Sequence, residues 1–414
     1  MNYPLFILTA AIYLSLLIVA ETTTIKIDPL SRKFIDEYNR TRIFHGMNAV
    51  YKIAPWHPTV EGYDENSTLS AVDAKNLKRW GFNVVRLGVM WVGVEPGERG
   101  NYNQTYLDQI EIIVDTLAAD DISVVLDFHQ DIWHRKFCGE GVPDYVYDLC
   151  VSSEPDGTSP FPHPSVNENY PIDEDGNPTL DACLSQTFIT YYLSAEVGAG
   201  FQCLYDNKHD LWSAFGGYWE AVATRFSKKE NVLGYELINE PWAGDIYESP
   251  KRLLEPGYTE KQYLQPLYEY LHGIIRKVDD EKIIFFEGLT IDYWQNGFTQ
   301  GPGGTAYNDR QALAYHIYCP FAEPSTVAVE LVCKAVDEEF FSRREKDSER
   351  LGTGLLMTEF GATKDVLGDL ISLERVASLA DKHQQSWVYW QLKYYQDLTT
   401  MTPQVIMTRP MTHM

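Results

Sequence analysis

Short apolar runs alternate with longer amphipathic segments along most of the chain. The runs are rich in Val, Ile, Phe and Tyr and predict strands. They lie at 43–50, 82–90, 123–128, 232–238, 282–287, 313–318, 355–359 and 387–393. Helical periodicity separates most of them, at 103–119, 210–226, 260–278, 326–345 and 366–383. Continuous apolar strands that alternate with helices are typical of a parallel sheet covered on both faces.

Eight strand–helix repeats predict the α/β fold class, with a (β/α)8 TIM barrel as the architecture. The 414 residues are ample for one such barrel. An open, doubly wound parallel sheet is the alternative that the same pattern leaves. We expect the barrel domain to occupy 21–400, and residues 401–414 to form a short irregular tail.

The stretch 132–208 interrupts the alternation of strands and helices. It contains Pro, Gly and Asp together with four of the six cysteines, which favours an ordered insertion held by disulfides. Loops of this length in compact domains are usually functional or disordered. Because the stretch follows the third strand, we expect it to lie over the C-terminal mouth of the barrel. A surface insertion without a function is the alternative.

Polar and aromatic residues stand at the carboxyl ends of six of the eight predicted strands. Barrel enzymes place their catalytic residues at these ends. Buried polar groups cost free energy unless they are paired, so a purely structural core would not gather them. In chain order they are Arg86, Asp127, His129, Asp131, Asn239, Glu240, His316, Tyr318, Glu359, Trp390 and Gln391.

Two of these residues are glutamates that follow or close a short apolar run. Glu240 follows the fourth predicted strand, and Glu359 closes the seventh. Two carboxyls that face each other across a cleft can hydrolyse a glycosidic bond, one as proton donor and the other as nucleophile. Taken singly, each residue has a structural explanation: Asn239 can cap a helix, Glu359 can belong to a turn, and Trp390 can pack in the core. Their joint position at one end of one sheet favours an active site.

The sequence resembles glycoside hydrolase family 5, whose members are retaining (β/α)8 glycosidases. The motifs behind the resemblance are Val-Val-Arg86-Leu, Leu-Asp-Phe-His129, Asn239-Glu240-Pro241, His316-Ile-Tyr318, Thr-Glu359-Phe-Gly and Trp390. The resemblance implies that Glu240 is the general acid/base and that Glu359 is the nucleophile. Retention requires carboxyls about 5–5.5 Å apart, which forces one of them to keep its proton. We expect Glu240 to keep it, because Arg86 and Tyr318 are expected to bind Glu359.

The resemblance also implies contacts to the substrate. Asn239 is expected to hold the sugar 2-hydroxyl, and Trp390 to form an apolar platform beneath the ring. His129 and Asp131 are expected to bind other sugar hydroxyls. The full set of implied substrate-binding residues is Lys52, Arg86, His129, Asp131, Asn239, Gln295, His316, Tyr318 and Trp390.

Longer motifs, at 127–131, 239–245, 316–320 and 389–395, resemble the endoglycoceramidases within that family. This narrower resemblance implies hydrolysis of the β-linkage between the oligosaccharide and the ceramide of glycosphingolipids, with release of the intact glycan. Such enzymes usually carry a β-sandwich after the barrel, which we expect this chain to lack. Another family 5 β-glycosidase (a β-glucosidase, a cellulase-like or a galactosylceramide-specific enzyme) and a non-catalytic glycolipid-binding protein are the alternatives.

A ceramide substrate needs an apolar trough beside the catalytic pair. The aromatic candidates in the loops after the fourth to sixth strands are Trp242, Tyr247, Tyr293, Trp294 and Phe321. We also expect transient contact with a membrane surface or with micelles, where such a substrate resides.

The formal charge of −25 and the pI near 4.7 narrow the range of partners. An acidic chain of this kind is a poor partner for nucleic acid and for anionic membranes. No group of His, Cys, Asp and Glu has the spacing of a zinc or calcium site, and no Gly-rich phosphate loop is present. We therefore predict neither a metal nor a cofactor.

The first 20 residues have the features of a secretory signal peptide. The apolar stretch at 5–20 ends in Ala20 before a polar segment, and it is shorter than a membrane span. An uncleaved anchor is the alternative. A secreted protein is therefore predicted, with an acidic endosomal or lysosomal lumen as the alternative location.

Six cysteines form an even set, which predicts up to three disulfides in a secreted chain. We expect pairs between neighbours in the sequence: Cys138–Cys150, Cys183–Cys203 and Cys319–Cys333. Three N-x-S/T triplets, at Asn39, Asn66 and Asn103, predict N-glycosylation.

Overall fold

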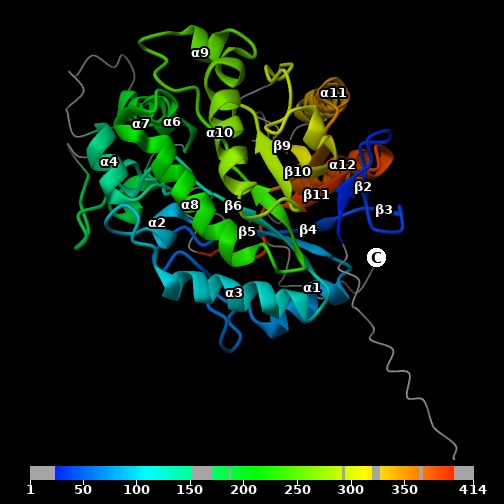
Figure 1. The fold of residues 1–414 in the computed structure, drawn as a ribbon. Helices are drawn as coiled ribbons and strands as arrows, with labels where there is room; N and C mark the ends of the chain where they lie inside the picture. The colour runs from blue at the N-terminus through cyan, green and yellow to red at the C-terminus, as the bar shows by residue number, and fades with distance from the viewer. Residues whose placement is uncertain are drawn as a thin grey trace, which may run out of the picture.

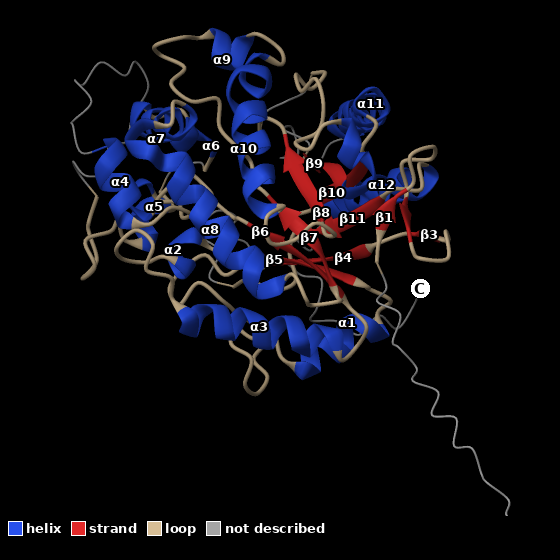
Figure 2. Cartoon of the chain, viewed as in Figure 1, coloured by secondary structure: helices blue, strands red, loops and turns tan. Residues whose placement is uncertain are grey.

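A closed barrel of eight parallel strands is the centre of the fold, in the order β10-β11-β4-β5-β6-β7-β8-β9. The computed structural model describes residues 24–151, 170–185, 188–290, 294–318, 327–362 and 367–395. Helices surround the strands on the outside (Figure 2). The predicted (β/α)8 barrel is confirmed. The doubly wound alternative is wrong, because that sheet would leave two edge strands unpaired and this sheet closes on itself.

All eight predicted strands are present, with ends that differ from the prediction by a few residues. They are β4 (His45–Ala49), β5 (Val84–Gly88), β6 (Ser123–Asp127), β7 (Val232–Glu236), β8 (Ile283–Glu287), β9 (Gln311–Ile317), β10 (Gly354–Phe360) and β11 (Ser386–Tyr389).

Period-two alternation along the strands divides the barrel interior into an apolar layer and a polar layer. Val84 on β5 and Val125 on β6 belong to the apolar cluster inside the barrel. Two residues further along the same strands are Arg86 and Asp127. The polar layer therefore lies at the carboxyl ends of the strands, and the apolar layer lies beneath it.

The barrel helices follow the strands in sequence order (Figure 1). They are α1 (Ala71–Arg79), α2 (Trp91–Val94), α3 (Gln104–Ala118), α8 (Leu211–Phe226), α9 (Lys251–Leu254), α10 (Gln265–Ile275), α11 (Val327–Leu351) and α12 (Leu367–Lys382). Helix α1 was not predicted, although its start carries a clear signal. The Ser70 side chain accepts a hydrogen bond from the Val72 N–H, and Asp73 completes a capping box.

A short antiparallel sheet closes the amino end of the barrel. Its strands are β1 (Lys26–Ile27), β2 (Phe34–Ile35) and β3 (Thr41–Arg42). Ile27 and Phe34 join the apolar cluster inside the barrel. The Phe34 ring centroid lies 5.4 Å from that of Phe44 and 6.3 Å from that of Phe285. In the described part of the chain, this sheet therefore covers the amino end of the barrel, and the polar layer lies toward the opposite end.

The insertion after β6 is mostly helical in its described parts. Its helices are α4 (Asp144–Val151), α5 (Leu180–Cys183), α6 (Ile189–Tyr192) and α7 (Ala195–Tyr205). They gather on one side of the barrel in Figure 1. The insertion reaches the carboxyl end of β6, because Asp131 and Glu140 exchange backbone hydrogen bonds of 3.0 and 2.7 Å.

Two disulfides hold the insertion, and they are not the predicted ones. Cys138 is bonded to Cys183, and Cys150 to Cys203. The predictions 138–150 and 183–203 are wrong because α4 packs against α7, which brings together cysteines that are 53 residues apart in the sequence. Cys333 is also disulfide-bonded, and its predicted partner Cys319 lies outside the described residues.

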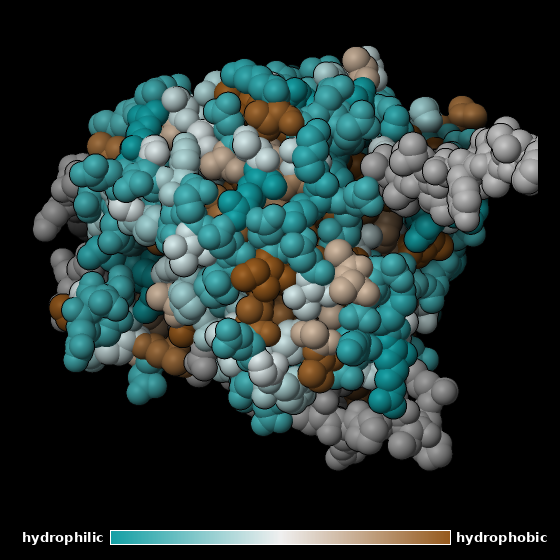
Figure 3. Space-filling view, turned by 60° about the horizontal axis from the view of Figure 1, so that its bottom comes forward, coloured by the Kyte–Doolittle hydropathy of each residue, from teal (hydrophilic) through white to brown (hydrophobic). Residues whose placement is uncertain are grey.

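The surface is mostly hydrophilic on the face seen in Figure 3, with hydrophobic residues in small separate groups.

The asparagines of the three predicted glycosylation triplets differ in exposure. Asn39 and Asn66 are exposed, whereas Asn103 is half-buried and caps α3. Within the described ranges, no helix combines the length and the apolar character needed to cross a membrane. The predicted signal peptide at 1–20 and the predicted tail at 401–414 lie outside the described residues.

Replacing both Cys150 and Cys203 by Ala is expected to lower the thermal midpoint by several degrees. The bond closes a loop of 53 residues, and in the chain-entropy account such a cross-link stabilises by about 4 kcal/mol. Circular dichroism melts of the double variant and the parent protein measure the effect. The matched control is the parent protein heated in reductant, which should shift in the same direction. An unchanged midpoint in the double variant would contradict the prediction.

Candidate active site

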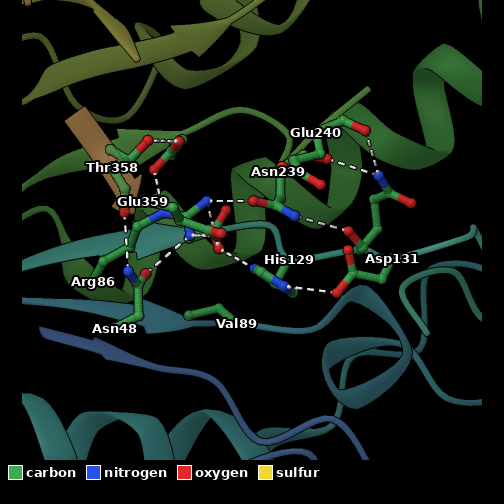
Figure 4. A network of polar contacts seen from close by, with 12 residues as sticks. Asn48, Arg86, Val89, His129, Asp131, Asn239, Glu240, Thr358 and Glu359 are labelled. Atoms are coloured by element: carbon green, nitrogen blue, oxygen red, sulfur yellow. Dashed lines mark hydrogen bonds and ion pairs between the residues drawn. The ribbon is translucent and has the colours of Figure 1, made fainter. Parts of the chain in front are cut away.

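Arg86 on β5 is the centre of the polar layer and is fully buried. Its guanidinium donates hydrogen bonds to Glu236 Oε2 and Glu359 Oε1, both at 2.6 Å, and to Asn239 Oδ1 at 2.7 Å (Figure 4). An ion pair of 3.1 Å joins it to Asp127 Oδ2. Burial disfavours the charged form, but the three carboxylate partners raise the pKa of Arg86 well above its ordinary value. Arg86 therefore acts as a fixed cation.

Glu359, on β10, receives a hydrogen bond on each of its two oxygens. Arg86 donates to Oε1 at 2.6 Å, and the hydroxyl of Tyr318 donates to Oε2 at 2.9 Å. Burial, followed by the charge of Glu359, raises the pKa of the Tyr318 hydroxyl well above its ordinary value. Tyr318 therefore keeps its proton and remains a donor. This is the arrangement that a carboxylate nucleophile needs.

Glu240 follows β7 and lies in a different electrostatic setting. Its Oε1 lies 2.8 Å from Nδ1 of His316. Burial lowers the pKa of His316 to about 4, so the imidazole is neutral near pH 7. Burial, followed by repulsion from Asp131, raises the pKa of Glu240 to about 7. A carboxyl that keeps its proton near neutral pH meets the main requirement of a general acid.

The backbone around Glu240 is fixed by two neighbouring strand ends. The φ angle of Glu240 is 40°, in the left-handed region that non-glycine residues seldom adopt. Its N–H donates to Glu287 Oε2 at 2.8 Å. The Gln130 amide donates to the carbonyl oxygens of Asn239 and Glu240, at 2.7 and 2.9 Å. These bonds stabilise the unusual conformation and so determine where the Glu240 carboxyl lies.

The two predicted catalytic carboxyls meet at the barrel mouth. One oxygen of Glu240, one oxygen of Glu359 and a ring nitrogen of His316 all lie within 4.8 Å of one another. Carboxyl groups about 5–5.5 Å apart are typical of retaining glycosidases, and inverting enzymes need about 6.5–9.5 Å to admit a water. The spacing therefore fits direct attack of one carboxylate on a sugar.

A row of alternating positive and negative side chains connects Arg86 to Lys52. Asp127 Oδ2 lies 3.1 Å from Arg86 and 2.8 Å from His129 Nδ1. His129 Nε2 lies 3.3 Å from Asp131 Oδ2, which also binds the ammonium of Lys52. Burial opposes the charged imidazole, but Asp127 and Asp131 raise the pKa of His129 to about 9. In Figure 4, His129 lies between the Arg86 group and Asp131.

Trp390 packs against this chain of charges. Its ring is stacked on His129, with centroids 5.2 Å apart and planes at 17°. The ammonium of Lys52 lies 4.5 Å from the ring centroid. Trp390 is only 3% exposed. Its role as a platform for the sugar stays a prediction.

Ten of the eleven predicted site residues lie in one connected cluster. They are Lys52, Arg86, His129, Asp131, Asn239, Glu240, His316, Tyr318, Glu359 and Trp390. Gln295 is the exception, because its side chain is exposed and no contact among the described residues links it to the cluster. The assigned catalytic and binding roles stay predictions.

The aromatic residues proposed for a ceramide trough do not form one surface. Trp242 is fully buried and packs against Tyr192 of the insertion, so its assignment to the trough is wrong. Tyr247 is half-buried, and its hydroxyl binds a backbone carbonyl. Trp294 is 56% exposed. Tyr293 and Phe321 lie outside the described residues.

The sequence does not single out several members of the cluster: Asn48, Glu140, Glu236 and Glu287. Asp127 is expected at the barrel mouth, but without an assigned role. Glu287 closes the fifth predicted strand as Glu359 closes the seventh, so its position was a usable signal. Glu236 and Asp127 stand at inward positions of the strand pattern. Glu140 comes from the insertion, where no strand pattern indicates which side chains face the site.

Three groups of His, Asp and Glu in the described part of the chain have ligand atoms close enough to hold a metal. They are His129/Asp131/Glu140, Glu236/Glu287/His316 and Glu240/His316/Glu359. Lys52 already supplies a positive charge to the first group. The third contains the predicted catalytic pair. We assign no metal to any of them.

Comparison with known proteins gives consistent matches over most of the chain. A family model described as cellulase (glycosyl hydrolase family 5) matches residues 46–396. An endoglycoceramidase of Cyanea nozakii is 39% identical over 373 residues, which cover 90% of this chain and 70% of that protein. An endoglycoceramidase of Hydra vulgaris is 38% identical over 372 residues, which cover 90% of this chain and 67% of that protein.

The fold also matches a solved structure. Endo-glycoceramidase II from Rhodococcus sp., in a complex with ganglioside GM3, superimposes with a TM-score of 0.70 at 22% identity. The match covers 87% of this chain and 76% of that one. It supports the barrel architecture.

Glu240→Gln and Glu359→Gln are each expected to lower turnover of a β-glycoside at least about a thousandfold, because each removes a proton-transfer or covalent role. Steady-state rates on an alkyl β-lactoside, whose leaving group needs a proton, measure the loss. The matched control is Glu248→Gln, which changes a largely exposed glutamate in the loop after β7. Near-normal turnover in both active-site variants would contradict the assignment.

The activity is expected to decline as pH rises through about 7, since Glu240 must be protonated to act as an acid and its pKa is about 7. Above that value kcat/KM should fall about tenfold for each pH unit. A dinitrophenyl β-lactoside, whose leaving group needs no proton, should show a much weaker decline. A pH–rate profile with both substrates separates the two cases. The same decline for both would show that the limb does not report Glu240.

Proposed function

This chain belongs to glycosyl hydrolase family 5, and we propose that it is a retaining endo-glycosidase that hydrolyses the β-linkage between the oligosaccharide and the ceramide of glycosphingolipids. The observation on which the mechanism rests is the approach of Glu240 and Glu359, whose nearest oxygens lie within 4.8 Å of each other. The substrate class is supported by the two relatives at 38–39% identity, both named endoglycoceramidase.

The first step forms a covalent glycosyl-enzyme. A carboxylate oxygen of Glu359 attacks the anomeric carbon, and the bond from that carbon to the ceramide oxygen breaks. Glu240 gives its proton to the departing oxygen, so that ceramide leaves as a neutral alcohol. The hydrogen bonds from Arg86 and Tyr318 hold Glu359 in place during the attack.

The second step releases the glycan. Glu240, now ionised, takes a proton from a water that attacks the anomeric carbon, and the bond to Glu359 breaks. Glu240 is thereby protonated again, and the carboxylate of Glu359 is restored. Neutral His316 fits both steps, because it contacts Glu240 at 2.8 Å without adding a fixed positive charge. Two inversions at one carbon leave the β-configuration of the product unchanged.

The sugar is held by polar and charged side chains beside the catalytic pair, among them Asn239, Asp131 and Lys52. Asn239 already accepts from Arg86 and donates to the Gln130 carbonyl, which leaves its second amide hydrogen for the sugar 2-hydroxyl. His129, Asp131 and Lys52 are proposed to bind other hydroxyls of the same sugar, with Trp390 against the face of its ring. Gln295 is exposed and would reach a sugar only at the rim of the site.

The ceramide is proposed to leave on the side of Glu240, since the proton donor must lie beside the departing oxygen. A small pocket opens there. Its lining combines the polar Glu240, Thr290, His316, Tyr318 and Asp337 with the apolar Ile317, Val336 and Phe340. The apolar members of this lining suit the start of a lipid chain better than a further sugar.

A secretory route and transient contact with a membrane or micelles complete the proposal. The two disulfides of the insertion support an oxidising compartment. The exposed triplets at Asn39 and Asn66 are suited to N-glycosylation. Contact with an amphiphile surface follows from the substrate, whose ceramide is anchored in one. An acidic endosomal or lysosomal lumen is the alternative location.

Incubation of the purified protein with lactosylceramide in mixed micelles tests the function. We expect mass spectrometry to detect intact lactose and intact ceramide in equal amounts, and early proton NMR spectra to show β-lactose before mutarotation. Glu359→Gln is the matched negative control. Galactose released ahead of lactose would show exo-acting hydrolysis and contradict the proposal.

The same assay separates the competing substrate classes. Hydrolysis of glucosylceramide or galactosylceramide with lactosylceramide left intact would assign a monoglycosylceramidase. Hydrolysis of cello-oligosaccharides alone would assign a cellulase-like enzyme. Binding of the glycolipid without any product would assign a non-catalytic role.

A further inference from the structure

Glu140 is a buried carboxyl of the insertion that lies next to Lys52 and Asp131. Its backbone pairs with Asp131 through two hydrogen bonds, Asp131 N–H to Glu140 O at 3.0 Å and Glu140 N–H to Asp131 O at 2.7 Å. This pairing attaches the insertion to the end of β6. It places the Glu140 side chain beside Asp131 and Lys52, both of which are proposed to bind the sugar.

The backbone around Glu140 has little freedom to move. A Cβ on Gly139 would lie 1.8 Å from the Asp131 carbonyl oxygen. Gly141 has a φ of 138°, and a Cβ there would lie 2.5 Å from the Gln130 Cβ. Cys138, in the left-handed region with a φ of 68°, is bonded to Cys183. Glycines on both sides and a disulfide two residues away therefore fix where Glu140 lies.

The side chain of Glu140 is 0% exposed, and its Oε1 lies 3.7 Å from the ammonium of Lys52. Neither of its oxygens accepts a hydrogen bond from a donor in the described part of the chain. Burial, opposed by Lys52 and reinforced by Asp131, raises the pKa of Glu140 well above its ordinary value. A neutral Glu140 can donate its proton to Asp131 and accept from Lys52 with the other oxygen.

The position of Glu140 matters because of the chain of charges in front of it. Lys52 binds Asp131, and Asp131 in turn contacts His129. If Glu140 were ionised, it would compete with Asp131 for Lys52 and repel Asp131 at the same time. A neutral acid leaves Lys52 to Asp131 and, after a small rotation of its carboxyl, can donate to Asp131 and so limit the movement of both side chains.

We propose that Glu140 is a positioning residue that holds Lys52 and Asp131 in the geometry that binds the glycan. The proposal rests on the proposed function for the identity of the glycan, but not for the contacts themselves. Because Glu140 is enclosed, it acts through Lys52 and Asp131. Removing it should therefore weaken binding of the sugar and leave the bond-breaking step almost intact.

The test compares Glu140→Gln with Glu140→Ala on lactosylceramide. Gln keeps a donor for Asp131 and an acceptor for Lys52, so kcat and KM should stay within about threefold of the parent. Ala removes both, and KM should rise roughly tenfold to a hundredfold with kcat within about threefold. Val142→Ala is the matched control, since it opens a cavity in the same hairpin and should lower the thermal midpoint without raising KM.

A double-variant cycle tests whether Glu140 acts through Lys52. In a Lys52→Met background, adding Glu140→Ala should raise KM less than about threefold further, because the group that Glu140 positions is already absent. Independent, multiplicative losses would overturn the proposal. A Glu140→Gln variant as impaired as Glu140→Ala would also overturn it, because the charge would then be required.

A second substrate keeps this test separate from the test of the proposed function. If the parent cleaves dinitrophenyl β-lactoside but not lactosylceramide, the proposed lipid substrate is wrong, and the cycle is measured on the lactoside. If the parent cleaves neither, the cycle is measured as calorimetric affinity for a lactose-type iminosugar. Equal affinity of the parent and Glu140→Ala would then overturn the positioning role.

Discussion

The geometry of the site depends on one buried cation that several carboxylates share. Arg86 is fully enclosed, and removing a guanidinium from water is costly unless its charge and its donors are matched. Asp127, Glu236 and Glu359 supply the opposite charges, and Asn239 supplies a neutral acceptor. None of these groups can move without leaving a donor of Arg86 unpaired. The interactions that offset the cost of burying the Arg86 cation therefore also fix the position of Glu359, the proposed nucleophile.

Charge balance explains why the carboxyls of the site behave differently. The site contains seven carboxyls and three cationic groups. The cationic groups are Lys52, Arg86 and His129. The carboxyls are Asp127, Asp131, Glu140, Glu236, Glu240, Glu287 and Glu359. The cluster approaches neutrality only if some of these carboxyls hold protons. Burial raises the pKa of Glu236 and of Glu240 to about 7, and those of Glu140 and Glu287 further. Protons therefore favour Glu140, Glu240 and Glu287, whose desolvation is not offset by a direct contact with Arg86, and Glu240 is the proposed acid. Glu236 is paired with Arg86 at 2.6 Å and supplies one of the opposite charges.

Much of this arrangement could be predicted from the sequence, because period-two patterning and strand ends are local signals. The pattern that places Arg86 and Glu359 inside the barrel predicts both the strands and the layer of polar groups. The disulfides could not be predicted, since Cys150 meets Cys203 only through the packing of α4 on α7. Glu140 could not be predicted either, because its position depends on how the insertion folds back onto β6. The position of a site residue on a strand can be predicted from the sequence pattern. The position of a site residue in an irregular insertion depends on the tertiary contacts of that insertion.

The polar and apolar groups around the catalytic pair favour one orientation of a glycolipid. Around Lys52 and Asp131, the insertion adds buried polar groups, including the Tyr192 hydroxyl at 3.5 Å from Asp131 Oδ1. Toward α11, a pocket beside Glu240 is lined in part by Val336 and Phe340. Hydroxyl-rich rings are better matched to the polar groups, and a hydrocarbon chain is better matched to the apolar part of the pocket lining. The proposed proton donor, Glu240, contributes to that pocket, where the leaving oxygen would be. Electrostatics and shape therefore favour the same binding mode, in which the bond between glycan and lipid lies between Glu240 and Glu359.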